Sequence, residues 1–217
     1  MSARATTIQR ARTARAAGFT LIEMLAVLLI LSLLVGVLVV QLGGAGEVVQ
    51  GNLTESRLAM IGAVLSEYEL ERGDWPASQL TTDQGAAPNA TNLGAECLVI
   101  ALWSREWDGK GVDDLDLVNS DGDLARKRLV DGFDDLQLRE LADHWGNPIA
   151  YFHHNDYGRE DLYVTFDPVT GEPVESVARA RKDPDTGRWY RGRKFQLLSA
   201  GSDGLFGTED DIDLVGR

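Results

Sequence analysis

Basic side chains are scarce in this sequence, and cysteine is almost absent. The 217 residues hold 21 lysines and arginines against 34 aspartates and glutamates, a net charge of −13. A nucleic-acid-binding protein needs a basic face to neutralise phosphates, so this balance argues against that class. The single cysteine cannot form an intrachain disulfide, so no disulfide framework holds the fold. The hydrophobic fraction of 44% is too high for a disordered acidic chain.

Recognisable catalytic motifs are also missing from the sequence. It contains no nucleophile elbow, zinc-protease motif, phosphate-binding loop or dinucleotide-binding glycine motif. His153 and His154 are adjacent, and neighbouring side chains on a strand point to opposite faces, so we expect them to make a poor metal pair. The sequence therefore predicts a protein that is not an enzyme.

The charge that is present is unevenly distributed around one long apolar segment. Residues 1–18 contain four arginines and no acid, whereas the rest of the chain carries 17 basic and 34 acidic side chains. Residues 19–42 follow as an apolar run interrupted by the charge of Glu23. As a helix this run would be about 36 Å long, enough for the ~30 Å hydrocarbon core of a membrane. The arginines before it place the N-terminus in the cytoplasm by the positive-inside rule.

Two simpler interpretations of the N-terminus are open. One is a cleaved secretory signal peptide with its cleavage site near Gly43 to Gly46, and the other is a plain signal anchor. The apolar run is longer than the roughly 7–15 residues of a signal peptide. Neither interpretation explains Glu23, because a carboxylate inside an apolar segment costs about 2.5–3.5 kcal/mol and usually has a functional partner.

The N-terminal segment resembles a known processing site. Gly18-Phe19-Thr20-Leu21-Ile22-Glu23, with arginines before it and the apolar run after it, resembles the prepilin peptidase site of type IV pilins and type II secretion pseudopilins. The resemblance implies cleavage between Gly18 and Phe19 and methylation of the new N-terminal Phe19. It also implies that Glu23 acts in assembly by pairing with the Phe19 amine of a neighbouring subunit, which offsets the desolvation of both charges.

The resemblance implies a pilin-like fold of the α+β class. Its long N-terminal helix is half transmembrane and is packed on a small antiparallel β-sheet. Apolar residues at helical spacing continue the helix as far as Gly73. The expected divisions are a cleaved leader at 1–18, a transmembrane half at 19–42, an amphipathic half at 43–73, and a periplasmic globular domain at 74–217.

Several shorter elements are expected within the globular domain. An apolar helix over Ala95–Trp103 would bury Cys97. Asp143 to Pro148 resembles the Asp-Pro-Trp-Gly-Asn-Pro signature of major pseudopilins, with His144 where proline is usual. Asp-Pro-Val-Thr-Gly at 167–171 and Asp-Pro-Asp-Thr-Gly at 183–187 read as turns. The expected strands are Ile149–His153, Leu162–Phe166, Val174–Ala178, Arg188–Tyr190 and Lys194–Ser199.

The resemblance to pseudopilins covers residues 15–76 and 140–213. The acidic insertion at 104–136 lies outside it. Nine aspartates fall between Asp108 and Asp135. A calcium loop around 119–123 is conceivable, but Leu117 and Arg128 occupy the first and twelfth positions of the EF-hand pattern, where ligands are required. A solvated acidic surface segment is the other interpretation.

The C-terminal loop at 199–213 is rich in glycine and aspartate. Ca²⁺ takes six to eight hard oxygen ligands, which such a loop offers from carboxylates and carbonyls, whereas a polar acidic tail is the plain alternative. The loop resembles the calcium loop of major pseudopilins. That resemblance implies one Ca²⁺ site, with the side chains of Asp203, Asp210 and Asp211 and the carbonyls of Ala200 and Thr208 as ligands.

The sequence thus predicts a structural subunit most like the major pseudopilin of a type II secretion system. Such a protein is a single-pass protein of the bacterial inner membrane, with a cytoplasmic N-terminus and a periplasmic C-terminal domain, and it assembles into a pseudopilus that drives protein export. Its partners would be copies of itself through the N-terminal helices, minor pseudopilins, the inner-membrane assembly platform and the prepilin peptidase.

Other functions remain open at this stage. A type IV pilin or a minor pseudopilin is the nearest alternative, although such pilins often close a C-terminal loop with a disulfide that the single Cys97 cannot form. A membrane-anchored calcium-binding module that does not polymerise is a further alternative.

Overall fold

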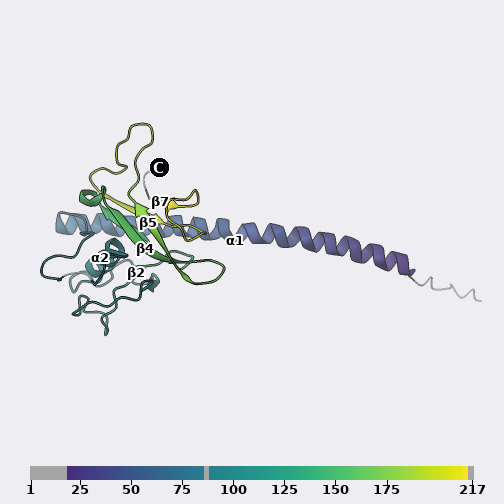
Figure 1. Cartoon of the computed structure of the whole chain (residues 1–217), viewed down its shortest axis with the longest axis horizontal. Coiled ribbons are helices and arrows are strands. Elements are labelled where there is room, and N and C mark those ends of the chain that lie inside the picture. The colour runs from purple at the N-terminus through teal and green to yellow at the C-terminus, as the bar shows by residue number, and fades with distance from the viewer. Residues whose placement is uncertain (1–18, 86–87, 215–217) are drawn as a thin grey trace, which may run out of the picture. The chain divides into compact units, whose positions relative to one another are not determined.

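The computed structural model describes residues 19–85 and 88–214, without the side chains of residues 38–45. The chain divides into two units, residues 1–45 and 46–217, which are described separately. Helix α1, Leu21–Arg72, contributes to both (Figure 1). The helix ends where the sequence predicts, because Gly73 adopts a φ of +81° that terminates it. The expected leader, residues 1–18, lies outside the described residues.

In the first unit, the described side chains of α1 are mostly apolar and exposed. Leu21 is 82% exposed, Leu28 62% and Leu33 64%. Among the described residues, no helix combines the length and the apolar character needed to cross a membrane.

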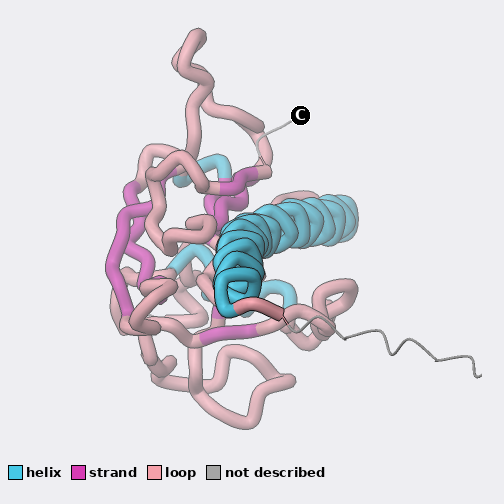
Figure 2. The backbone as a smooth tube through the Cα atoms, turned by 90° about the vertical axis from the view of Figure 1, so that its right-hand side faces the viewer, coloured by secondary structure: helices cyan, strands magenta, loops and turns pink. Residues whose placement is uncertain are grey.

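The second unit combines the C-terminal part of α1 with a second helix and short strands joined by long loops (Figure 2). Its remaining elements are α2 (Leu93–Leu102), β1 (Leu117–Val118), β2 (Glu140–Leu141), β3 (Ala150–His153), the 3₁₀ helix η1 (His154–Asp156), β4 (Glu160–Phe166), β5 (Pro173–Arg179), β6 (Phe195–Ser199) and β7 (Ile212–Asp213).

The strands of the described residues form three small antiparallel sheets, where we expected one. The first pairs β1 with β2, the second has the order β3-β6-β7, and the third pairs β4 with β5. The prediction of a strand at Arg188–Tyr190 is wrong. Trp189 makes only an isolated antiparallel bridge with Lys182, and its neighbours do not extend this bridge into a strand. The α+β class is confirmed, but the β-structure is divided by long loops.

The main core of the second unit lies between α1, α2 and β6. Leu58, Ile61 and Leu65 recur at helical spacing along α1 and are almost fully buried. They pack in one cluster with Leu98 of α2 and Leu197 of β6. Burying each such side chain contributes about 1.5–3 kcal/mol, so this stripe is the main link between the helix and the rest of the unit.

A second core lies where α2 meets β3. Gly94 permits this approach, because a Cβ at this position would overlap the backbone carbonyl oxygen of Tyr151. The Tyr163 hydroxyl accepts a hydrogen bond from the Tyr151 N–H at 3.2 Å. Cys97 is buried in α2 as expected, and burial raises the pKa of its thiol.

The Asp143 to Pro148 signature forms a tight turn held by one carboxylate. Asp143 Oδ1 accepts hydrogen bonds from the N–H groups of Trp145 and Asn147, at 2.8 and 2.9 Å. The His144 N–H donates to the Thr54 hydroxyl of α1 at 3.3 Å. A proline has no N–H, so the departure from the usual signature at this position adds a bond to the helix.

The two predicted Asp-Pro turns are confirmed and are built in the same way. Asp167 Oδ1 accepts from the Thr170 N–H at 2.7 Å, and Asp183 Oδ1 accepts from the Thr186 N–H at 2.8 Å. Gly171 and Gly187 close the turns with positive φ angles of 70° and 66°. The first turn joins β4 to β5, whereas the second lies in a loop.

Candidate functional site

The start of α1 is closed by a reciprocal pair of side chains. The N–H and the hydroxyl of Thr20 both donate to Glu23 Oε2, at 2.8 and 2.9 Å. The Glu23 N–H donates back to the Thr20 hydroxyl at 3.3 Å. This arrangement is a capping box, which satisfies backbone donors at a helix N-terminus. The Thr-x-x-Glu spacing was the sequence signal for it, and reasoning from the apolar context of Glu23 alone missed it.

Glu23 remains able to bind a second partner. The carboxylate is exposed, and none of the described hydrogen bonds uses Oε1. A positive group brought up to Oε1 would therefore not have to displace the capping bonds made by Oε2. The capping role and the expected assembly role are compatible on one side chain.

Comparison with protein families identifies this same segment. Residues 13–39 match the prokaryotic N-terminal methylation motif. The chain has a type IV pilin-like N-terminus. This motif belongs to structural, pilin-type proteins and supports prepilin peptidase processing, N-methylphenylalanine and pilus-like assembly. Comparison with curated proteins found no match, and comparison with solved structures found none either.

In the C-terminal loop, Asp210 is already bound by the loop's own donors. Its Oδ2 accepts from the N–H and hydroxyl of Ser202, at 2.7 and 2.9 Å, and from the N–H of Asp203 at 3.0 Å. Its Oδ1 accepts from the Thr208 hydroxyl at 2.6 Å. Burial raises the pKa of Asp210, but these hydrogen bonds outweigh it and leave the pKa below its usual value. Asp210 therefore joins the two sides of the loop through these hydrogen bonds.

Asp211 and Asp203 have partners different from those of Asp210. Asp211 Oδ2 accepts from Arg181 Nη2 at 2.6 Å and from the Gly207 N–H at 2.8 Å. Asp203 Oδ1 accepts from the Leu205 N–H at 2.7 Å. Burial raises the pKa of Asp211, and the bonds from Gly207 and Arg181 oppose it.

The loop fits the expected calcium ion in part. Asp211 Oδ1 is buried and has no hydrogen-bond partner, as a ligand atom would be. However, the guanidinium of Arg181 already pairs with Asp211 and supplies the positive charge that a calcium ion would provide. Within the described residues, two groups of three carboxylate or histidine side chains have ligand atoms within 4.8 Å of one another, and both lie outside this loop. The ligand set that includes Ala200 and Thr208 stays a prediction.

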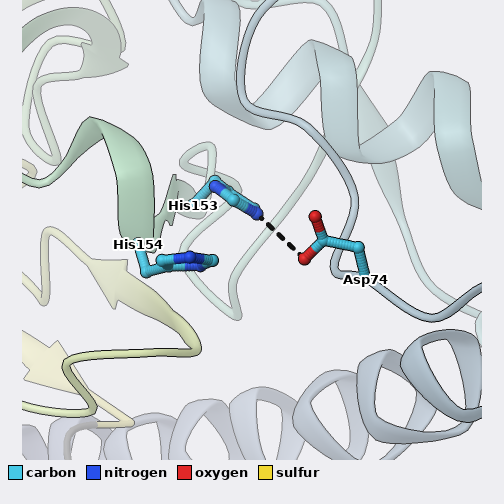
Figure 3. A group of neighbouring side chains, drawn as sticks. All are labelled: Asp74, His153 and His154. Carbon is cyan, nitrogen blue, oxygen red and sulfur yellow. Dashed lines mark hydrogen bonds and ion pairs between the residues drawn. The ribbon is translucent and has the colours of Figure 1, made fainter.

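Asp74, His153 and His154 form one of those two groups (Figure 3). The expectation that the two histidines point to opposite faces is wrong, because β3 ends at His153 and His154 begins η1. The chain turns there, and the two rings lie with their centroids 4.2 Å apart.

Hydrogen bonds join His153 and Asp74 in this group, whereas His154 Nδ1 is buried without a hydrogen-bond partner. His153 Nδ1 accepts from the Asn155 N–H at 3.2 Å, so the proton of the neutral ring lies on Nε2. Nε2 then donates to Asp74 Oδ1 at 3.4 Å. The hydrogen bond from the Trp75 N–H is the main cause that lowers the pKa of Asp74. The group links the chain just beyond α1 to the end of β3.

Proposed function

We propose that this chain is a pseudopilin, a structural subunit of a type II secretion system. It would polymerise into a periplasmic pseudopilus that drives protein export. The methylation motif at 13–39 is the observation that carries this proposal. Processing would occur after Gly18, and the mature chain would begin with methylated Phe19.

The apolar surface of α1 supports both membrane anchoring and assembly. Exposed apolar side chains from Leu21 to Val37 would be unfavourable in water, at about 25 cal/mol per Å². We propose that a single-pass insertion of residues 19–42 in the inner membrane covers them before assembly. Neighbouring helices would cover them in the filament. This arrangement places residues 46–217 in the periplasm.

The assembly role of Glu23 is tested by separating its charge from its capping bond. Glu23→Gln keeps an oxygen that accepts from Thr20 but removes the charge that would pair with a neighbour's Phe19 amine. Thr20→Ala removes the capping hydroxyl and keeps the carboxylate. We expect Glu23→Gln to abolish crosslinking between neighbouring N-terminal helices, and Thr20→Ala to retain it. The opposite pattern would assign Glu23 to capping alone.

The N-terminus of the mature protein distinguishes the alternatives. Mass spectrometry that finds methylated Phe19 supports a pilin-like subunit, whereas an intact Met1 or cleavage near Gly46 contradicts it. A type IV pilin or a minor pseudopilin shares this processing, so the length and location of the filament separate them from a major pseudopilin. A chain with methylated Phe19 that never crosslinks to itself would be a membrane-anchored module that does not polymerise.

Calcium at the C-terminal loop is a second, separate part of the proposal. The partnerless Oδ1 of Asp211 supports it, and the ion pair with Arg181 opposes it. If bound, the ion would supply positive charge among Asp203, Asp210 and Asp211 and so stabilise the loop. Loss of one bound Ca²⁺ in Asp203→Asn, measured by calorimetry, would support this site.

A further inference from the structure

A second acidic group is formed by residues from the middle of the sequence, between 96 and 140. Glu96 in the first turn of α2, Asp121 in the loop after β1, and Glu140 in β2 have carboxylate oxygens within 4.8 Å of one another. Asp123 stands two residues from Asp121 and raises the pKa of Glu96 through its charge. We call these four residues the acidic cluster. They come from three segments that are far apart in the sequence.

Glu96 is the residue of this cluster that points to a ligand. It is 1% exposed, and its Oε1 is buried without a hydrogen-bond partner. Asp123 Oδ1 and Asn119 Oδ1 are also buried and unpartnered. An unpaired buried polar group is unfavourable, and a charged one is more so, so three such oxygens in one region require an explanation.

The other carboxylates of the cluster have neutral partners. Glu140 accepts from Asn92 Nδ2 at 3.1 Å and from the Ser120 N–H at 3.2 Å. Asp121 accepts from Asn89 Nδ2 at 2.9 Å. Within residues 19–85 and 88–214, no lysine or arginine forms an ion pair with any member of the cluster.

The surroundings of the cluster disfavour negative charge. Burial raises the pKa of Glu96 to about 10, and the charges of Asp123, Glu140 and Asp121 add to this. Burial likewise raises the pKa of Glu140 to about 8 and that of Asp123 to about 6. Burial and mutual repulsion thus act together against the charged forms of these closely spaced carboxylates.

We propose that the acidic cluster binds one Ca²⁺ ion, with Glu96, Asp121 and Glu140 as ligands. Oxygens that share a calcium ion at about 2.3–2.6 Å lie no more than about 5 Å apart. The carboxylate oxygens of Glu96, Asp121 and Glu140 lie within 4.8 Å of one another and so meet this requirement. The unpartnered Oδ1 atoms of Asp123 and Asn119 are further candidates for the six to eight oxygens that calcium takes. The donors are all hard oxygens, which favours calcium over zinc or copper.

The ion would join parts of the second unit that the sequence separates. Glu96 belongs to α2, which packs on β2 and β3, and Glu140 lies in β2 itself. A bound ion would therefore fix the acidic insertion against α2. Only one aspect of this inference rests on the proposed function, namely that folding is completed outside the cytoplasm, where calcium is more abundant.

Calcium binding is tested on the full, unassembled chain in detergent, with CaCl₂ as the probe. We expect millimolar Ca²⁺ to raise the melting temperature of the wild type. Glu96→Gln removes the buried charge at nearly constant shape and should raise the Kd for Ca²⁺ by at least about tenfold, since even an indirect change near a metal costs this much. Asp121→Asn should have the same effect and serves if Glu96→Gln does not fold.

Two control variants make the result specific. Asp131→Asn changes an exposed acid of the same insertion outside the cluster and should leave calcium binding unchanged. Asp211→Asn changes the C-terminal loop and should leave the response to Glu96→Gln intact. A wild-type melting temperature that ignores Ca²⁺ would overturn the proposal. So would Ca²⁺ binding that, in an Asp211→Asn background, survives both Glu96→Gln and Asp121→Asn. An equal effect of Mg²⁺ would overturn the assignment to calcium.

This experiment does not depend on assembly. Failure of calcium binding would leave crosslinking through Glu23 to be judged on its own result. Failure of crosslinking would in turn leave calcium binding at the acidic cluster unaffected.

Discussion

Two acidic regions of this chain meet the same electrostatic problem in different ways. In the C-terminal loop, Asp210 accepts four hydrogen bonds and Asp211 pairs with Arg181. In the acidic cluster, Glu96 is more deeply buried and has no partner for Oε1. Local sequence explains the difference, because Ser202, Asp203 and Thr208 lie within eight residues of Asp210, whereas the cluster is assembled from distant segments.

Acidic composition alone therefore does not locate a cation site. The C-terminal loop has the more suggestive sequence, with glycines and aspartates close together. The acidic cluster has the stronger structural case. Glu96 Oε1 and Asp211 Oδ1 are both buried without a hydrogen-bond partner, but Asp211 has Arg181 as a counter-charge, whereas no described lysine or arginine pairs with the cluster.

The largest effect is expected from Asp210→Ala. It leaves the Ser202, Asp203 and Thr208 donors without their acceptor, so we expect a loss of about 2–4 kcal/mol in the free energy of unfolding. Urea denaturation with Ca²⁺ and with EDTA measures it. If the loop is closed by its own hydrogen bonds, the loss is the same in both buffers. A loss that appears only with Ca²⁺ would show that a metal ion holds the loop.

A smaller effect of opposite sign is expected from Glu96→Gln in calcium-free buffer. Glu96 must be protonated on folding at neutral pH, because its pKa of about 10 lies far above its ordinary value. We therefore expect the variant to be more stable than the wild type by about 1–3 kcal/mol at pH 7. Asp131→Asn is the matched control and should change stability very little.

The same cluster predicts how stability changes with pH in the absence of calcium. Folded Glu96 and Glu140 hold protons that the unfolded chain has released above pH 4.5, so their stabilising contribution is complete below that pH. It is lost as the pH rises toward about 8 for Glu140 and about 10 for Glu96. In EDTA, the melting temperature should therefore fall as the pH is raised from about 5 to about 9. A melting temperature that stays constant or rises over this range would contradict the conclusion that Glu96 and Glu140 are buried without a counter-charge.

The smallest effect is expected from Arg181→Gln. This change removes the ion pairs to Asp211 and Asp213, but Arg181 is partly exposed, so we expect a loss of only about 1 kcal/mol. It also removes the positive charge that competes with a cation. If the C-terminal loop can bind Ca²⁺ at all, calorimetry should detect it more readily in this variant than in the wild type. If Arg181→Gln binds calcium as the wild type does, the C-terminal loop is not a calcium site that Arg181 blocks. The acidic cluster would then be the site at which a change of charge alters calcium binding.

Several elements follow directly from the sequence because short-range chemistry determines them. The end of α1 before Gly73, the short helix around Cys97, and the Asp-Pro turns at 167–171 and 183–187 agree with expectation. The expectation of one sheet failed because strand pairing depends on contacts between distant segments. The histidine prediction failed because the sequence does not show that β3 ends at His153.

Sequence alone is enough to locate the processing motif, the Thr-x-x-Glu spacing from which Thr20 and Glu23 form their capping box, and the apolar helix that follows. Each of these needs only neighbouring residues and the helical period. The tertiary structure alone decided which acids are satisfied. Glu96 and Glu140 lie 44 residues apart, and only the packing of α2 against β2 brings their carboxylates together in a buried place where charge requires a partner.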